Sequence, residues 1–387
     1  MRVISRYTTQ FTNSAVTCGV VAMLVAAFFS LLWLRKHNFD VAQLVVAGDQ
    51  FSDPHLVPRN LPVENRSAGY DGQFYYRLAL NPFTRQVSEF GIRLDYPIYR
   101  QQRILFPFLA WLISAGHPAA VPGAFLAINL LSIGLLGWAA ARIAQSYGAA
   151  PFWGVAMWLY PGWPLTLARD CVELLEIALL ACMVLALIRD HVRVATVLAI
   201  AAVFTKETAL LGVIGCLVVF AFCGELRKKS AYATVAVITT SAYAVFKYLL
   251  FWAWHAPVRL GTGIFGAPLN GVLRAARSLA CSATTVDRWY LLEILGLFVL
   301  TYLCIRMVRA SRAWPLAIVA ACYGLMLVSL DQTVWIEDWA FLRASAEYCF
   351  FCGCIIAGSS RIWRTIGTVF VIGFWTLITS KLLFLLE

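Results

Sequence analysis

The sequence predicts an all-α polytopic membrane protein of about 10–12 transmembrane helices with a large first external loop. Of its 387 residues, 61% are apolar and only 13% are charged, and the mean hydropathy is +0.75. Apolar runs of spanning length recur almost to the C-terminus. Charges and prolines gather instead in one stretch, from Arg35 to Arg103. No room remains for a separate soluble domain, so we expect one integral-membrane domain, residues 1–387.

The N-terminal segment, residues 1–34, contains the first predicted span. Arg2 and Arg6 precede an apolar run from Ala15 to Leu34. This run is longer than the apolar core of a signal peptide, and no clear small-residue cleavage motif follows it. We therefore expect an uncleaved first helix with the N-terminus in the cytoplasm.

Residues 35–103 form the predicted external loop, because a charge at the bilayer centre costs about 2.5–3.5 kcal/mol on insertion scales. Within it, Asp71 stands just before a short predicted helix, Gln73 to Leu80. In one interpretation, Asp71 caps this helix and the neighbouring aromatic rings anchor the loop at the bilayer surface. In the other, the carboxylate removes a proton from a sugar hydroxyl, while amide donors and aromatic faces hold the sugar. The aromatic residues concerned are Tyr70, Phe74, Tyr75 and Tyr76.

Residues 104–387 form the predicted multi-span bundle, and we expect ten or eleven crossings in the whole chain. The run from Ile104 to Gly116 is short and contains Pro107, which is more typical of a re-entrant or interfacial segment than of a span. The later spans are expected at about residues 121–143, 151–165, a segment ending near 188, 194–222, 232–252, 290–305, 314–330, 346–357 and 366–386.

The run from Val194 to Phe222 is interrupted in its middle by Lys206 and Glu207. Two arrangements fit this pattern: a hairpin with these residues near its outer turn, or one long helix with a buried ion pair. Because the two residues are adjacent, their side chains point in different directions, and we expect a different partner for each.

The distribution of charge predicts the orientation of the chain. The net charge is +11, and much of it lies in short loops between apolar runs. This is the positive-inside pattern, so the bilayer, and not nucleic acid, is the expected partner. With the basic loops in the cytoplasm, the external loop, the segments Arg169–Glu173 and Asp331–Arg343 and the Lys206–Glu207 pair share the outer face.

Several charged residues near this outer face have both an ordinary and a functional interpretation. Arg169, Glu173 and Glu176 share roughly one helical face, and either Arg169 neutralises Glu173 or the group lines a polar cavity. Arg100 and Arg103 either snorkel to lipid phosphates or face a substrate. Asp338 and Arg343 precede an apolar helix, where Arg343 either anchors the helix or reaches a phosphate.

The eleven cysteines do not predict a metal site or a disulfide framework. None lies in the external loop, and most fall within apolar runs, where cysteine behaves as a small hydrophobe. Cys349, Cys352 and Cys354 are closely spaced in an apolar helix, but no histidine or fourth ligand accompanies them.

With these motifs in view, the sequence resembles the GT-C superfamily of integral-membrane glycosyltransferases, which use polyprenyl-phosphate sugars. The nearest resemblance is to bacterial transferases that form cell-surface glycopolymers, and GPI mannosyltransferases are more distant. The likeness covers roughly the first 220 residues. The motifs that carry it are Tyr70-Asp71-Gly72-Gln73-Phe74-Tyr75-Tyr76, Tyr99-Arg100-Gln101-Gln102-Arg103-Ile104-Leu105, Pro161-Gly162 with Arg169-Asp170, and Lys206-Glu207.

The resemblance implies a GT-C-like helical bundle in the cell inner (cytoplasmic) membrane, with its active site facing the periplasm or exterior. It implies Asp71 as the catalytic base, a polyprenyl-phosphate-linked sugar as donor, and inversion at the anomeric carbon. Lys206 and Arg343 are the expected phosphate partners, followed by Arg103. The acceptor is a glycan, a lipid or a protein. The substrate-binding residues that we predict are Tyr70, Gln73, Tyr75, Arg100, Arg103, Arg169, Asp170, Glu173, Lys206, Glu207, Asp338 and Arg343.

One departure from the family concerns metal use. The loop carries a single convincing carboxylate, whereas some family members carry paired acids, so metal dependence stays open and we expect no cofactor. The main alternative function is a transporter or flippase of a lipid-linked saccharide, which tends to show repeated halves with matched helix breaks. A weaker alternative is a non-catalytic assembly subunit that only binds glycolipid.

Overall fold

The computed structural model describes residues 2–154, 159–222, 226–255, 264–282 and 284–385. Across these ranges the regular structure is almost entirely helical, and its few strands are each two residues long. By length and composition, five helices could cross a membrane, and the predicted all-α polytopic class is confirmed. The apolar segments of these five helices are Ser14–Arg35, Val121–Ser146, Lys229–Trp254, Thr285–Val308 and Arg361–Leu382.

The bundle contains helices of very different lengths. It begins with α1 (Arg2–Arg35) and continues after the external loop with α4 (Leu105–Ser114) and α5 (Val121–Ser146). The helices that follow are η2 (Pro151–Gly154), α7 (Gly162–Leu167), α8 (Glu173–Ile188), α9 (Val192–Thr205), α10 (Ala209–Phe222), α11 (Leu226–Trp254), α12 (Asn270–Ala280), α13 (Thr285–Val308), α14 (Trp314–Val328), α15 (Gln332–Trp335), α16 (Asp338–Ala344), α17 (Ala346–Gly358) and α18 (Arg361–Leu385).

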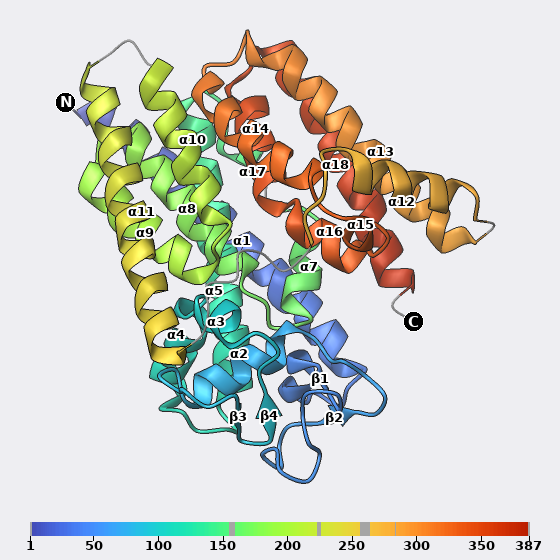
Figure 1. Ribbon diagram of the computed structural model, residues 1–387. Coiled ribbons are helices and arrows are strands. Elements are labelled where there is room, and N and C mark those ends of the chain that lie inside the picture. The colour runs from blue at the N-terminus through green and yellow to red at the C-terminus, as the bar shows by residue number, and fades with distance from the viewer. Residues whose placement is uncertain (1, 155–158, 223–225, 256–263, 283, 386–387) are drawn as a thin grey trace.

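Small residues bring α1 and α5 close together. A Cβ atom at Gly19 would lie 2.6 Å from the carbonyl oxygen of Gly134, and one at Gly137 would lie 2.9 Å from the Cβ atom of Ala22. Such faces let helix backbones approach where lipid supplies no hydrophobic driving force. Further along, α8 packs on α5 and α9, α10 packs on α11 and α14, and α14 packs on α17. Figure 1 shows α8 to α11 on one side of the bundle and α12 to α18 on the other.

The external loop lies at one end of the bundle, as its blue to blue-green ribbon in Figure 1 shows. Its strands pair as β1 with β2 in parallel and as β3 with β4 in antiparallel. Helix α2 forms its core, because all of residues 72–80 are buried, and it packs against α4 and α5. The elements of the loop are η1 (Val41–Val45), β1 (Ala47–Gly48), β2 (Val63–Glu64), α2 (Asp71–Leu80), β3 (Ser88–Glu89), β4 (Ile92–Arg93) and α3 (Pro97–Gln101).

The interruption at Lys206 separates two helices. Helix α9 ends at Thr205, Lys206 has an extended backbone with φ −158° and ψ 132°, and α10 begins at Ala209. The single long helix is therefore wrong, and the chain turns near Lys206 and Glu207.

Two other segments bear on the number of helices that cross the membrane. Helix α4 has 10 residues, about 15 Å of rise, which is half of a bilayer core of about 30 Å. In the predicted span 151–165 the described residues form only η2 and the start of α7, and residues 155–158 lie outside the description. The number of crossings stays a prediction.

Helix α12 is an element that the sequence reasoning missed. It buries Val272, Ala275 and Leu279 while Leu273 is 52% exposed. The three- and four-residue spacing of its buried side chains was the available signal.

Candidate active site

The local structure around Asp71 differs from a helix cap. Helix α2 begins at Asp71, two residues earlier than predicted, and Tyr70 occupies the N-cap position. The two Asp71 carboxylate oxygens accept hydrogen bonds from guanidinium groups, at 2.7 Å from Arg100 and 3.3 Å from Arg343. Phe74, Tyr75 and Tyr76 are at most 3% exposed and pack inside the loop. The interpretation of Asp71 as a cap beside bilayer anchors is therefore wrong.

Arg100, at the end of α3, holds the outer side of Asp71. Its Nε and Nη2 atoms donate to both oxygens of Asp95, at 2.8 and 2.6 Å, while its Nη1 atom donates to Asp71. The guanidinium also lies 4.2 Å from the centroid of the Phe74 ring. Arg100 and Arg103 are both buried and paired with acids, so the expectation that they snorkel to lipid phosphates is wrong.

Arg343, on α16, links the external loop to the bundle. One of its nitrogen atoms, Nη2, lies 3.3 Å from Asp71 and 2.6 Å from Glu173 at the start of α8. Residues 272 positions apart in sequence are thus joined by a charge-assisted contact. The Arg343 side chain is only 9% exposed to solvent, so these two carboxylates are its main charged contacts among the described residues.

Lys206 lies deeper, among three glutamates. Its Nζ atom is 2.9 Å from Glu347, 3.4 Å from Glu176 and 3.7 Å from Glu173. The hydroxyl oxygen of Thr208 lies within hydrogen-bond distance of both carboxylates, at 3.0 Å from Glu176 and 2.9 Å from Glu347. These contacts extend the chain of ion pairs from the loop into the bundle. We call the connected set the ion-pair network, and its members are Asp95, Arg100, Asp71, Arg343, Glu173, Lys206, Glu176 and Glu347.

The separate partners expected for Lys206 and Glu207 are confirmed. Glu207 accepts a hydrogen bond of 2.8 Å from the Nε atom of Arg103. Arg103 also donates from Nη1 to the Tyr75 hydroxyl at 3.1 Å and contacts the Tyr99 hydroxyl. The Arg103–Glu207 pair lies beside the network and links the segment just before α4 to the turn between α9 and α10.

Arg169 stands apart from the carboxylates. Its guanidinium lies 3.6 Å from the ring centroid of Trp339 and 4.3 Å from that of Tyr70. Within the described part of the chain no carboxylate pairs with it, and Glu173 pairs instead with Arg343 and Lys206. The mutual neutralisation of Arg169 and Glu173 is therefore wrong. Arg169 is a cation held between aromatic faces, and none of the described carboxylates forms an ion pair with it.

Three predicted substrate-binding residues have other surroundings. The Gln73 side chain is buried and binds Gly48, Ser52 and Ala68, so it cross-links the loop. Asp170 is fully buried in a left-handed conformation, φ 44°, and its two carboxylate oxygens have no hydrogen-bond partner among the described residues. Asp338 begins α16, and its side chain lies outside the description. None of the three belongs to the network as described.

Three residues of this region were not among the predicted substrate-binding residues, although one interpretation of the sequence placed Glu176 beside Glu173 in a polar cavity. Glu176 follows Glu173 by one helical turn, and Glu347 is the lone acid of an apolar helix, which was the available signal for each. Trp339 gave no signal of its own, because its role depends on Arg169 in a distant segment.

The charges of the loop residues follow from their partners. Burial raises the pKa of Asp71, but the guanidinium groups of Arg100, Arg343 and Arg103 outweigh it and hold that pKa well below its usual value. Burial raises the pKa of the Tyr70 phenol to about 12, so Tyr70 is neutral at pH 7. The site thus presents an ionised carboxylate, the guanidinium groups that surround it and a neutral phenol.

Metal binding at this site stays untested. The described residues include no group of three or more His, Cys, Asp or Glu side chains arranged to hold a metal ion. Cys349, Cys352 and Cys354 are buried free thiols.

The fold and the network together define a polytopic α-helical membrane protein with a chain of buried ion pairs running from an extramembrane loop into its bundle. No protein-family model matches this chain, and a search of curated proteins finds no match. Its function is therefore inferred from the fold and the site.

Proposed function

We propose that the protein is a glycosyltransferase that moves a sugar from a polyprenyl-phosphate donor to an acceptor hydroxyl, with Asp71 as the base. One observation carries the proposal: among the four acids that pair with Arg343 or Lys206, Asp71 has the most exposed side chain. Its side chain is 23% exposed, whereas those of Glu173, Glu176 and Glu347 are 3%, 0% and 1% exposed. A substrate hydroxyl therefore reaches Asp71 before any of the buried glutamates.

The surroundings of Asp71 suit both ends of such a donor. Arg169 and Arg343 offer positive charge, and the rings of Tyr70 and Trp339 offer flat faces on which a sugar stacks. The loop adjoins an apolar bundle, so the polyprenyl tail stays in the bilayer while the phosphate and sugar reach the site. This placement is the main support for a lipid-linked donor over a soluble one.

In the proposed reaction, Asp71 accepts the proton of the acceptor hydroxyl as the hydroxyl oxygen attacks the anomeric carbon. The bond from that carbon to the phosphate oxygen breaks on the opposite face, and its electron pair leaves with the polyprenyl phosphate. The phosphate changes from a singly charged diester to a doubly charged monoester. Cations that gain contact with this added charge lower the barrier, and Arg169 and Arg343 are placed to do so.

The proposed location is a bacterial cytoplasmic membrane, with the loop on the periplasmic or exterior side and a glycan, lipid or protein as acceptor. The described Lys and Arg residues of the short loops support this orientation, because they lie at the ends of helices away from the external loop. These residues are Arg142, Arg189, Arg193, Lys229, Arg306, Arg309, Arg312, Arg361 and Arg364.

The test measures release of polyprenyl phosphate from labelled polyprenyl-phosphate sugars by the purified protein with a membrane-derived acceptor fraction. We expect Asp71→Asn to lower the rate by about 100-fold or more, the usual size of a general-base effect. Asp95→Asn is the matched control, because it removes the other acid bound to Arg100 and leaves Asp71 in place. Turnover that survives Asp71→Asn in a folded protein would remove Asp71 from the mechanism.

A second candidate is a flippase of a lipid-linked saccharide. The observation that favours it is the cluster of three glutamates around Lys206 inside the bundle, because buried ionisable groups often mark transport pathways. Reconstituted vesicles with a fluorescent lipid-linked saccharide separate the two functions. Movement of the saccharide between leaflets without release of lipid phosphate selects the flippase, and release without movement selects the transferase.

A further inference from the structure

A second site lies at the end of the bundle away from the external loop. A cavity of about 530 Å³ opens between α8, α10 and α11 on one side and α14 and α17 on the other. Its wall includes Ile188, and Glu173 of the ion-pair network lies at the opposite end of the same helix, about 22 Å away along the axis. The volume falls within the range of about 300–1,000 Å³ that is common for ligand pockets.

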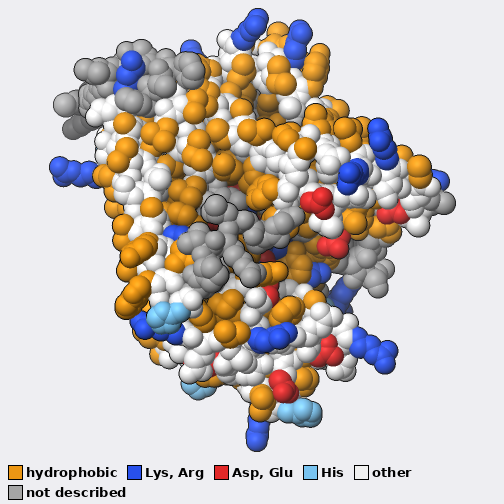
Figure 2. Space-filling view, viewed as in Figure 1, with side chains coloured by type: hydrophobic (Ala, Val, Ile, Leu, Met, Phe, Trp, Pro, Cys, Tyr) orange, Lys and Arg blue, Asp and Glu red, His pale blue; other side chains and the backbone are white. Residues whose placement is uncertain are grey.

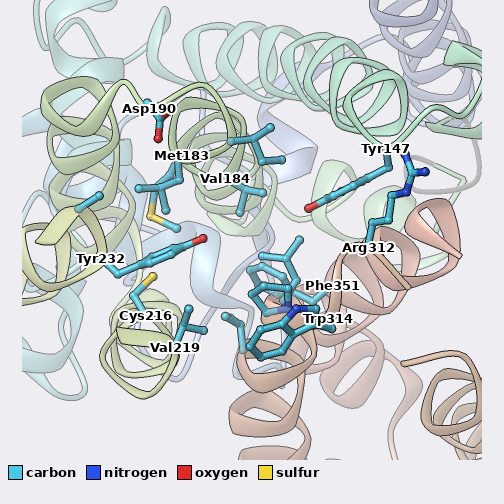
Figure 3. Close-up of a pocket in the computed structure, with 16 residues that line it drawn as sticks. Tyr147, Met183, Val184, Asp190, Cys216, Val219, Tyr232, Arg312, Trp314 and Phe351 are labelled. Atoms are coloured by element: carbon cyan, nitrogen blue, oxygen red, sulfur yellow. The ribbon is translucent and has the colours of Figure 1, made fainter. Parts of the chain in front are cut away.

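The interior of the cavity is apolar. Met183, Val184, Val219 and Phe351 line it and are each at most 2% exposed on the folded chain. Figure 3 shows Phe351 and Trp314 on one side, with the Tyr147 and Tyr232 hydroxyls pointing toward the middle. An interior of this kind suits a hydrocarbon chain better than a sugar or nucleotide.

The rim of the cavity carries charge of both signs. Arg312 lies beside Tyr147, and Asp190 lies across the cavity from them (Figure 3). Arg312 is exposed, and within the described residues no carboxylate pairs with it. Asp190 follows the last residues of α8 in a left-handed turn, φ 61°. The rim therefore carries an exposed cation and an exposed anion on opposite sides of the cavity, and neither forms an ion pair with another described residue.

The cavity also lies where membrane lipid is available. Trp314 and Ile188, in its wall, are 44% and 36% exposed on the apolar surface of the bundle. Figure 2 shows hydrophobic side chains over the bundle and Lys and Arg side chains at the end away from the loop. Aromatic residues beside basic ones are typical of the headgroup layer.

We propose that this cavity binds one glycerophospholipid of the bilayer, with an acyl chain inside and a phosphatidylethanolamine-type headgroup at the rim. The lipid phosphate accepts hydrogen bonds from Arg312 and Tyr147. The ammonium group of the headgroup lies toward Asp190. A zwitterionic headgroup satisfies both rim charges, whereas a phosphatidylglycerol headgroup would leave Asp190 without a cationic partner.

The test titrates palmitoyl-oleoyl phosphatidylethanolamine onto the full-length protein in detergent and measures bound lipid by native mass spectrometry. Phosphatidylglycerol with the same acyl chains and a polyprenyl phosphate are the competing probes. Arg312→Ala is the rim variant, and Arg309→Ala is its matched control, because Arg309 is an exposed arginine of the same loop outside the cavity wall. Val184→Trp fills the interior.

We expect Arg312→Ala to weaken phosphatidylethanolamine binding at least tenfold, and Arg309→Ala to change it less than twofold. Asp190→Asn should remove the preference for phosphatidylethanolamine over phosphatidylglycerol. Equal effects of the two arginine variants, or tighter binding of either competing lipid by the wild type, would overturn the assignment. If Val184→Trp fails to fold, a lipid with a photoreactive acyl chain replaces it, and labelling that misses α8, α10, α14 and α17 counts against the proposal.

Discussion

Replacing Lys206 with methionine tests the central ion-pair network most directly. The change keeps an unbranched side chain and removes the charge. Glu173 keeps Arg343 at 2.6 Å, so the loss of stability comes from Glu176 and Glu347. Among the described residues, Lys206 is the cation that lies within 4 Å of these two glutamates. Both glutamates are at most 1% exposed, so water does not replace the lost partner. Breaking a buried pair in this way costs about 3–5 kcal/mol.

The assay is equilibrium unfolding in mixed dodecyl maltoside and dodecyl sulfate micelles, followed by the fluorescence of the 14 tryptophans. Lys36→Met is the control, because Lys36 is an exposed lysine at the start of the external loop. The double variant Lys206→Met with Glu347→Gln should recover at least about 1 kcal/mol relative to additivity, since the two side chains are in contact. A deficit below about 1 kcal/mol would refute the network as described.

Three further predictions concern the loop side of the site. Arg169→Ala should raise the KM for the lipid-phosphate sugar at least about tenfold while the midpoint of micelle unfolding stays near that of the wild type, because Arg169 pairs with rings and not with acids. Although partial burial raises the pKa of Asp71, its guanidinium partners outweigh this effect and hold that pKa below the ordinary value of about 3.9, so its stabilising effect is present above that pH and lost in stronger acid. The stability cost of Asp71→Asn should therefore be constant from pH 5 to pH 8 in the same assay. Gly72→Ala should cost about 1–3 kcal/mol, because the added Cβ atom would lie 2.6 Å from the Val45 carbonyl oxygen and 2.7 Å from that of Arg169. Gly123→Ala, with no neighbour within 4 Å, should cost less than about 0.5 kcal/mol.

The sequence was sufficient for the features that depend on local composition. The external loop and the break at Lys206 could be predicted because charges and an interrupted apolar run are visible without knowledge of distant partners. Asp71 could be singled out because it is an acid among aromatic residues in a stretch that cannot lie in lipid. Each of these inferences needs only the energetic difference between water and hydrocarbon.

The choice of partners could not be predicted, for two physical reasons. The pairing of Arg169 with Glu173 assumed helical spacing, but α8 begins only at Glu173 and the residue after Arg169 has φ 44°, so the four-residue rule does not apply. The pairing of Lys206 with Glu347 joins residues 141 positions apart, and it depends on how α17 packs against α8 and the α9–α10 turn.

These pairings change which cation we expect to contact the donor phosphate first in the proposed mechanism. Lys206 is surrounded by three carboxylates and is 8% exposed, so a phosphate would have to displace buried acids to reach it. Arg169 forms no ion pair with a carboxylate in the described part of the chain and is the first contact that we expect. Arg343 is shared between Asp71 and Glu173, and its contact with Asp71, at 3.3 Å, is the longer one. When Asp71 accepts a proton, Arg343 loses one of its two acidic partners and keeps Glu173, at the same moment that the phosphate gains a charge. Proton transfer and leaving-group stabilisation are then coupled through one arginine, and Arg343→Lys, which keeps the charge but loses the planar fork, should lower the rate more than it raises the KM for the donor.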